Sequence, residues 1–418
     1  MLKKFSLLFG LLLLFASFAG CGSTTPSETP GGDDGGPKFD PTDLPYYVED
    51  TDTLTYSYSE EERLRPYWMG NVIYNEQLMV VEKDGVVEGH LLYDALRVIS
   101  VRDWTLQKEY TEGVDYVIEG NTITLPEGSS IPVFKDEWSK GIDVPEEYPE
   151  GNAGTGYQMF ADGVIYTETG LIYKNYIHVT YVYDPAQVDR TKVKTYADEL
   201  YGLTQMIKNK QSIDMVVFGD SISEGNSSSE TWNREPFCPP YAKLVARGLE
   251  LFGGVEVNFT NISKGGEAST WAAQEEQLSR LASLAPDFLI VAFGTNDVYN
   301  DLVGSGYKNN IKEIVRTAKD ANSECQIILV APFPSNEAAK TPRAHELMCE
   351  KLQEIVAETE YLDVAYVSMY EGVLEMLQTK NYYEVAANNV NHPNDFVHRF
   401  YAMNILSAIF DFESLAKA

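Results

Sequence analysis

The second half of the chain, from about residue 187 to residue 418, alternates short apolar runs with longer amphipathic segments. Short apolar runs are typical of strands buried on both faces, and apolar residues at helical spacing are typical of helices that cover a sheet. Their regular alternation predicts a parallel sheet with helices on both faces, because parallel strands need crossover connections. The expected strands are 213–218, 255–261, 288–293, 326–331 and 364–367. The expected helices are 195–208, 240–251, 270–284, 308–321, 343–358 and 394–410.

Residues 45–186 show a different pattern, in which apolar and polar residues alternate with a period of two. Such runs, separated by Gly, Pro, Asn and Asp, predict short antiparallel strands, and Glu119-Gly120-Asn121 predicts a tight hairpin. Several strands at this spacing favour an antiparallel β-sandwich of the jelly-roll kind. The expected strands are 54–58, 72–81, 97–101, 115–118, 122–125 and 171–183.

The segment before this region predicts export. In residues 1–20 a positively charged start precedes an apolar run that is too short for a permanent transmembrane helix, which is typical of a signal peptide. Ala19-Gly20-Cys21 resembles a bacterial lipobox, which implies that Cys21 is acylated; plain secretion is the alternative. Residues 21–44 are rich in Ser, Thr, Pro, Gly and Asp, which predicts a disordered tether. We expect an exported protein, lipid-anchored to the bacterial cell envelope, whose folded part is extracytoplasmic.

The charge and the cysteines exclude several classes of function. A chain with a net charge of −31 is repelled by phosphate backbones and anionic headgroups. We therefore expect no nucleic-acid partner and no membrane contact except through the anchor. Cys238, Cys325 and Cys349 form neither a disulfide framework nor a zinc-binding spacing. We therefore expect no metal and no cofactor. The sequence leaves the oligomeric state open.

Four polar segments mark the expected ligand-binding edge of the parallel sheet. Gly219-Asp220-Ser221 ends the first strand and so places a serine hydroxyl at a strand's carboxyl end, where ligands bind in open α/β sheets. Residues 261–267 follow the second strand, and Gly294-Thr295-Asn296-Asp297 follows the third. Residues 389–394 precede the last helix and contain His392. A hydroxyl, an imidazole and an amide at one sheet edge are the groups that nucleophilic catalysis uses.

In order and placement these segments resemble the four blocks of the SGNH (GDSL) hydrolase superfamily, which contribute a Ser, a Gly, an Asn and a His. The resemblance covers about half of the chain and implies a flavodoxin-like sheet of five strands. It implies that Ser221 is the nucleophile and His392 the general base. It also implies an oxyanion hole formed by the backbone N–H groups of Ser221 and Gly266 and the side-chain amide of Asn296; Gly265 is the alternative to Gly266.

The chain departs from the superfamily pattern at the third residue before the histidine. Many members have an Asp there, and this chain has Asn389. An amide accepts the imidazole N–H through its oxygen but brings no charge. We therefore expect a Ser-His dyad in which Asn389 or a backbone carbonyl supports His392. An Asp from elsewhere, such as Asp395, is the alternative.

The layout is similar to that of carbohydrate acetyl esterases that carry a jelly-roll domain before an SGNH domain. With a sandwich over 45–186 and a hydrolase over 187–418, we expect a serine esterase that removes acetyl groups from a polysaccharide. The alternatives are a lipase-like or lysophospholipase-like enzyme and an inactive carbohydrate-binding surface lipoprotein. Trp232, in the long loop after the nucleophile, is expected to form a wall of the acyl or sugar pocket. The irregular stretch 140–161 is expected to cover the edge of the cleft.

Overall fold

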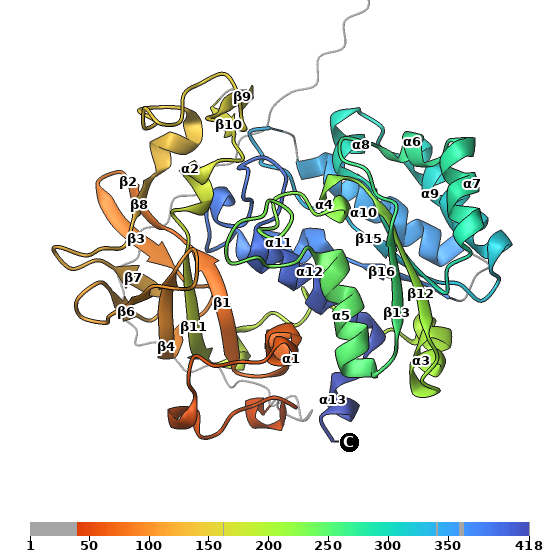
Figure 1. Cartoon of the computed structure of the whole chain (residues 1–418), viewed down its shortest axis with the longest axis horizontal. Helices are drawn as coiled ribbons and strands as arrows, with labels where there is room; N and C mark the ends of the chain where they lie inside the picture. Colours follow the sequence, from red (N-terminus) through yellow and green to blue (C-terminus); the bar gives the residue numbers. More distant parts are fainter. Residues whose placement is uncertain (1–39, 162, 340–341, 359–362, 418) are drawn as a thin grey trace, which may run out of the picture. The chain divides into compact units, whose positions relative to one another are not determined.

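The C-terminal region is built on a parallel sheet whose five strands lie in the order β13-β12-β14-β15-β16 (Figure 1). All neighbouring strands in this sheet are parallel. This is the 2-1-3-4-5 order of flavodoxin-like folds. The expected flavodoxin-like sheet is confirmed, with strand ends within two residues of the predicted positions. The strands are β12 (Ile213–Gly219), β13 (Val257–Asn261), β14 (Phe288–Ala292), β15 (Gln326–Val330) and β16 (Val364–Val367).

Helices cover both faces of this sheet because successive strand side chains point to opposite sides. Met215 and Val217 of β12 pack in the core that contains α5 and α12. Val216 and Phe218 pack in the core that contains α7, α9 and α10. The helices are α3 (Tyr201–Lys208), α4 (Ser221–Glu224), α5 (Tyr241–Gly253), α6 (Ser269–Ala272), α7 (Glu275–Leu284), α8 (Thr295–Tyr299), α9 (Ser305–Ala321), α10 (Pro342–Glu358), α11 (Met369–Met376), α12 (Asp395–Ile409) and α13 (Phe412–Leu415).

The N-terminal region contains two larger sheets, in the orders β1-β11-β4-β5 and β6-β7-β3-β2-β8, and a hairpin of β9 and β10. Their neighbouring strands are antiparallel except for the parallel pair β2–β8. Short helices α1 (Glu60–Leu64) and α2 (Gly170–Tyr173) accompany them. The strands are β1 (Val72–Leu78), β2 (Val80–Lys83), β3 (Val86–His90), β4 (Ala95–Asp103), β5 (Glu109–Tyr110), β6 (Val117–Glu119), β7 (Thr122–Thr124), β8 (Val133–Lys135), β9 (Gln158–Ala161), β10 (Val164–Tyr166) and β11 (Ile177–Tyr183).

The expected antiparallel β region is confirmed, and three of its predicted strands need correction. The predicted strand 72–81 is two strands, β1 and β2, which belong to different sheets. Residues 54–58 form no strand, and the beginning of the predicted strand 171–183 is helix α2. Leu171 and Ile172 are fully buried, so their apolar character reflects packing of a helical turn rather than strand alternation. The hairpin predicted at residues 119–121 is confirmed, since Glu119 pairs with Thr122 between β6 and β7.

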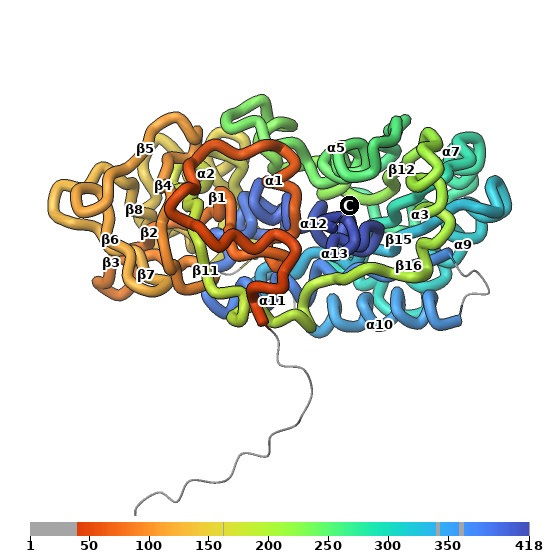
Figure 2. Tube along the Cα trace, turned by 90° about the horizontal axis from the view of Figure 1, so that it is seen from below, coloured from red at the N-terminus to blue at the C-terminus, as the bar shows by residue number. Residues whose placement is uncertain are grey.

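Helix α12 lies between the two regions, as Figures 1 and 2 both show. All its residues are buried, which is expected for a helix that contacts the parallel sheet on one side and the N-terminal region on the opposite side. On that opposite side, the backbone N–H of Phe396 donates to Gln77 of β1 at 2.9 Å. The Arg399 guanidinium donates to the carbonyl oxygen of Asn75 at 2.9 Å. The two regions therefore share a hydrogen-bonded core around this helix.

The computed structural model describes residues 40–417 except 162, 340–341 and 359–362, and residues 40–418 group as one compact unit. The predicted signal peptide, Cys21 and most of the predicted tether lie outside the described residues. Within the described part, no helix is both long enough and apolar enough to span a bilayer.

Candidate active site

Ser221 is the first residue of the short helix α4 and follows the end of β12 by two residues. The turn is stabilised by Asp220, whose side chain accepts a hydrogen bond from the backbone N–H of Ile222 at 3.0 Å. Burial raises the pKa of Asp220 to about 6. Ser221 itself is 5% exposed and stands at the predicted edge of the sheet.

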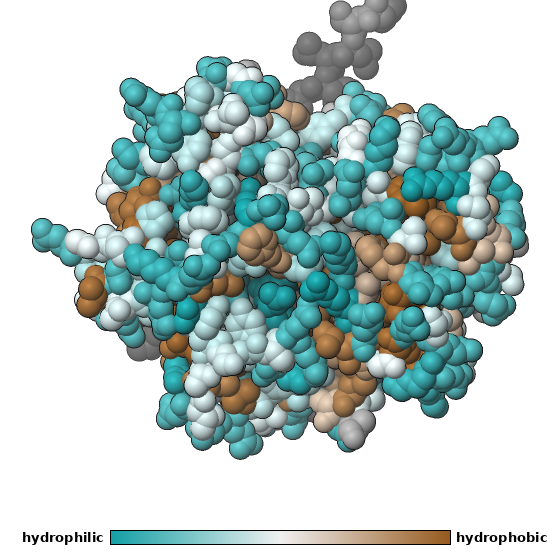
Figure 3. All heavy atoms as spheres, viewed as in Figure 1, coloured by the Kyte–Doolittle hydropathy of each residue, from teal (hydrophilic) through white to brown (hydrophobic). Residues whose placement is uncertain are grey.

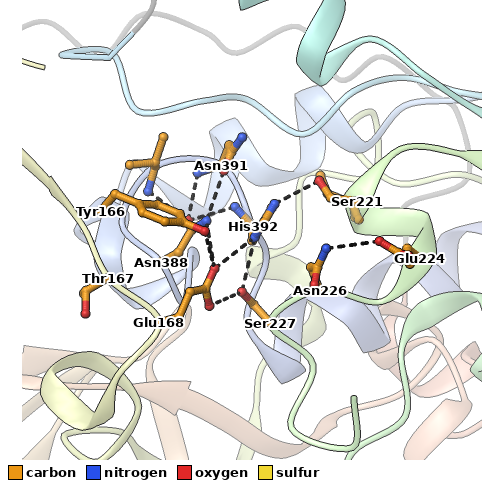
Figure 4. Close-up of polar contacts among 12 residues, drawn as sticks. Tyr166, Thr167, Glu168, Ser221, Glu224, Asn226, Ser227, Asn388, Asn391 and His392 are labelled. Carbon is orange, nitrogen blue, oxygen red and sulfur yellow. Dashed lines mark hydrogen bonds and ion pairs between the residues drawn. The ribbon is translucent and has the colours of Figure 1, made fainter. Parts of the chain in front are cut away.

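His392 reaches the same hydroxyl from the loop before α12. Its Nε2 atom lies 2.9 Å from Ser221 Oγ (Figure 4). The loop is held by Asn388, whose side-chain oxygen accepts three backbone N–H groups, including that of His392 at 3.0 Å. Asn394 then caps α12 through its side-chain oxygen. The structure therefore brings Ser221 and His392 together as the block pattern predicts.

The imidazole has a second partner that comes from the N-terminal region. Glu168 Oε1 lies 3.2 Å from His392 Nδ1, and the side chain of Glu168 is only 5% exposed. Ser227 donates its hydroxyl to Glu168 Oε2 at 2.9 Å, and the Tyr166 hydroxyl donates to Oε1 at 3.1 Å. Figure 4 shows Glu168 and Ser221 on opposite sides of the imidazole. A carboxylate, an imidazole and a serine hydroxyl thus lie in series.

The electrostatics of this series favour a nucleophilic serine. Burial alone would raise the pKa of Glu168, but hydrogen bonding to His392, the imidazole charge and the donors Ser227 and Tyr166 bring it below its ordinary value. An ionised carboxylate only accepts hydrogen bonds, so the imidazole donates its Nδ1–H to it. In the neutral ring Nε2 is then unprotonated and able to take the proton of Ser221.

Asn389 does not support the imidazole, and this corrects the prediction made for it. Its side-chain NH2 donates to the carbonyl oxygens of Ser139 at 3.0 Å and Ile165 at 3.3 Å. Its backbone has a φ of +64°, in the left-handed region, and its side chain is bonded to the N-terminal region. The alternative Asp395 instead accepts the backbone N–H of Ser229 at 2.8 Å. The orienting group is a glutamate, not Asn389, a backbone carbonyl or Asp395.

Sequence reasoning missed Glu168 because no local pattern marks it. It is 224 residues from His392, in the other region of the chain. Thr167-Glu168-Thr169 matches none of the four blocks. The one available signal was the long irregular stretch just before it, since loops of that length are often functional.

The three predicted oxyanion donors lie in the segments that follow β12, β13 and β14. Within the described residues, the backbone N–H groups of Ser221 and Gly266 donate no hydrogen bond to the protein. Asn296 lies in α8, and its side-chain amide donates one hydrogen to the carbonyl of Glu267 at 2.8 Å, which leaves its second hydrogen for a ligand. Gly266 has a φ of +77°, a conformation that strains other residues.

Gly265, the neighbouring glycine, has a different role. The Gly265 N–H already donates to Glu224 Oε2 at 2.9 Å. A Cβ at Gly265 would lie 2.7 Å from that carboxylate oxygen and 3.6 Å from Ser221 Cβ. Gly265 therefore allows the close approach of the loop to the nucleophile, and Gly266 is the glycine whose N–H has no acceptor in the described part of the chain.

The loop after the nucleophile is fixed from two sides. His398 is fully buried; its Nδ1 accepts the backbone N–H of Tyr241 at 3.3 Å, so its Nε2–H donates to the carbonyl of Asn226 at 3.2 Å. Burial lowers the pKa of His398 to about 4, which keeps the ring neutral. Arg234 donates to the carbonyl oxygens of Ser227 at 3.4 Å and Glu168 at 3.5 Å. It therefore ties this loop to the segment that carries the glutamate.

Trp232 lies in the same loop and is 42% exposed, with the Arg234 guanidinium 6.0 Å from its ring centroid. Its expected place in the pocket wall stays a prediction. Cys238, Cys325 and Cys349 are buried free thiols. Among the described residues, no group of three or more His, Cys, Asp and Glu side chains is arranged to hold a metal ion.

Comparisons with known proteins match part of the chain. Residues 217–400 match the model of the GDSL-like lipase/acylhydrolase family. No curated protein matches the chain. Among solved structures, a two-domain esterase active on acetylated mannans, co-crystallised with mannopentaose, is 20% identical, with 51% of this chain and 53% of that chain covered and a TM-score of 0.39.

Two further structures match a similar share of the chain. A catalytic mutant of Axe2, an acetylxylan esterase from Geobacillus stearothermophilus, is 19% identical over 48% of this chain and 95% of that chain, with a TM-score of 0.39. A member of the lipolytic protein G-D-S-L family from Veillonella parvula is 20% identical over 46% of this chain and 96% of that chain, with a TM-score of 0.36. The chain thus spans about half of the two-domain esterase and nearly all of the two shorter chains.

Proposed function

Since the C-terminal region carries a GDSL-like lipase/acylhydrolase domain, we propose that the chain is a serine esterase in which Ser221, His392 and Glu168 form the catalytic triad. The observation that carries the proposal is the pair of contacts on the two ring nitrogens of His392, 2.9 Å to Ser221 Oγ and 3.2 Å to Glu168 Oε1. A histidine with a purely structural role does not need contacts to both a serine and a carboxylate. The hydroxyl of a buried serine can equally well donate its hydrogen bond to a backbone carbonyl.

The proposed reaction uses each group in turn. His392 Nε2 takes the proton of Ser221 as Oγ attacks the ester carbonyl carbon. The negative charge on the carbonyl oxygen is stabilised by the N–H groups of Ser221 and Gly266 and the amide of Asn296. Glu168 stabilises the imidazolium, which then protonates the leaving alcohol. Water, activated by His392 in the same way, hydrolyses the acyl-enzyme and restores the free hydroxyl.

The proposed substrate is an acetyl ester on a neutral polysaccharide. The net charge of −31 and the carboxylates near the nucleophile, Glu168 and Glu224, disfavour anionic lipids and anionic sugars. The face seen in Figure 3 is largely hydrophilic, and its apolar residues form small separate groups. The negative charge of the chain therefore gives no support to the lipase-like alternative. The assembled Ser-His-Glu series disfavours an inactive binding protein.

The test is hydrolysis by the purified chain and by its Ser221→Ala variant. Both are incubated with acetylated xylan, acetylated mannan, ethyl acetate and a lysophospholipid, and the released acid is measured. The proposal predicts acetate release by the unmutated chain alone. Release of fatty acid from the lysophospholipid in preference to acetate supports the lipase-like alternative. Equal release by the Ser221→Ala variant contradicts the serine mechanism.

We also propose that the chain is exported and anchored through a lipid on Cys21, on the strength of the sequence of residues 1–21 alone. A lipid anchor would hold the enzyme at the cell surface, where polymeric substrates too large to enter the cell are found. Labelling of cells with a radioactive fatty acid tests this. The label should enter the unmutated chain and not the Cys21→Ala variant, and an unlabelled, secreted chain would support plain secretion.

A further inference from the structure

The hairpin of β9 and β10 joins the two sides of the active site. Its second strand leads through Thr167 to Glu168, which contacts His392. Its first strand carries Phe160, whose ring lies edge-on against Tyr299, with the ring centroids 5.5 Å apart and the planes at 82°. One short hairpin therefore reaches from the carboxylate of the proposed triad to helix α8.

Helix α8 is the helix that carries the proposed oxyanion donor. Tyr299 follows Asn296 by three residues, so the two side chains lie on the same face of the helix. The contact between Phe160 and Tyr299 therefore places an aromatic pair beside the oxyanion side of the site. In Figure 1 the hairpin and α8 lie in the upper half of the view, on either side of α4, which begins with Ser221.

The strand pairing in the hairpin fixes where Phe160 lies relative to Glu168. Val164 pairs with Ala161 and Ile165 with Met159, so Phe160 lies opposite the boundary between Val164 and Ile165. Glu168 is three residues beyond Ile165, which corresponds to roughly 10 Å along an extended chain. Phe160 is therefore joined to Glu168 by one strand pairing and three further residues of chain.

Exposure and charge identify the kind of molecule that fits this ring. Phe160 is 46% exposed, whereas Tyr299 is half-buried, so Tyr299 supports the Phe160 ring and leaves part of it open to a ligand. Aromatic rings bind apolar faces, and a pyranose presents such a face without carrying charge. The carboxylates of Glu168 and Glu224 near the nucleophile would repel a uronate or a phosphate.

We propose that Phe160, supported by Tyr299, is the platform on which the neutral pyranose ring next to the scissile ester stacks. This rests on the proposed esterase function and adds the part of the substrate that the site recognises. The hairpin then has two tasks, since it supplies the carboxylate of the triad and binds the sugar. An acetyl ester without a sugar ring gains nothing from the platform.

The test compares Phe160→Ala with Phe160→Tyr, which keeps the ring, and with Leu96→Ala, which removes an apolar side chain that is 69% exposed on β4. Turnover is measured on an acetylated xylo-oligosaccharide and on ethyl acetate, whose leaving group has no ring. Selectivity is the ratio of the two kcat/KM values. Loss of one ring contact should lower it about 3- to 10-fold in Phe160→Ala, mainly through KM. Phe160→Tyr and Leu96→Ala should keep it.

A binding measurement separates this proposal from the proposed function. In the Ser221→Ala background, Phe160→Ala should weaken binding of the same acetylated oligosaccharide about 3- to 10-fold by calorimetry, whether or not the unmutated chain is an esterase. Unchanged binding overturns the platform, and so does an equal loss of turnover on ethyl acetate, because Phe160 would then act only through Glu168. Stronger binding of an acetylated uronate oligomer than of the neutral oligosaccharide also overturns it.

Discussion

Replacing Glu168 with Gln tests the role of the carboxylate with little change in shape. The carboxylate lies 3.2 Å from His392 Nδ1 and is almost fully buried, so it stabilises the imidazolium that forms when Ser221 loses its proton. At an effective dielectric of about 20, unit charges at this distance attract by about 5 kcal/mol. This is an upper limit, because Ser227 and Tyr166 also hydrogen-bond to the carboxylate and share its charge.

A loss of about 3–5 kcal/mol of imidazolium stabilisation corresponds to a decrease of about 10²- to 10⁴-fold in kcat. A glutamine also has an NH2 group, and if this group faces Nδ1 the imidazole is held in the tautomer that cannot accept the serine proton. Because Glu168 contacts no proposed substrate atom, KM should change much less than kcat. The assay is steady-state hydrolysis of ethyl acetate, in which the sugar platform plays no part.

Glu82→Gln is the matched control, since it makes the same chemical change at a glutamate of β2 whose side chain is 43% exposed. It should keep kcat within about twofold, as most surface substitutions are nearly neutral. Circular dichroism and thermal unfolding check that both variants fold. A Glu168→Gln variant that folds and keeps more than half of the unmutated kcat would refute the triad and return the enzyme to a Ser-His dyad.

Three further substitutions test other parts of the site. Asn296→Ala removes a proposed oxyanion donor and should lower kcat about 10²- to 10³-fold on every ester, whereas an unchanged kcat would remove Asn296 from the oxyanion hole. Asn389→Gly keeps the positive φ but loses two hydrogen bonds to the N-terminal region. Denaturant unfolding should show that the free energy of unfolding falls by about 1–3 kcal/mol. The decrease in kcat should be smaller than in Glu168→Gln. Asp220→Asn tests the raised pKa of the buried carboxyl. Because the folded pKa of about 6 exceeds the unfolded value of 3.8, the folded state holds more protons between these values, and stability should fall as the pH rises from about 4 to about 6. The variant should lack this loss of stability, which totals about 3 kcal/mol at most across the pH range. An equally large loss in the variant would contradict the assignment.

The parallel sheet was predictable because its signals are local. Each strand is a short apolar run and each long helix repeats its apolar residues at helical spacing, so residues 213–218 and 364–367 could be assigned without their neighbours. Ser221, Gly266 and Asn296 follow consecutive strands of the chain, and consecutive βα units bring their carboxyl ends to one edge. The start of α12 was predictable from the capping residue Asn394.

The origin of the carboxylate was not predictable, because it depends on how the two regions pack. Asn389 stands where the resemblance to the SGNH (GDSL) superfamily leads one to expect an Asp, and a local interpretation assigned it a role that its side chain does not have. The acid instead follows the end of β10, at Tyr166, and lies 224 residues before His392. Packing also determines which short alternating segments become strands. Residues 54–58 alternate like a strand but have no partner strand, and Leu171 belongs to a helical turn.

The most direct test of the central claim is covalent labelling by a fluorophosphonate, which reacts with activated serines, followed by mass spectrometry of the peptides. The account predicts one adduct per chain, on Ser221, that forms rapidly in the unmutated protein and at least 100-fold more slowly in Glu168→Gln. An adduct on another serine, or equal labelling rates in the two proteins, would contradict the claim that a glutamate of the N-terminal region activates Ser221 through His392.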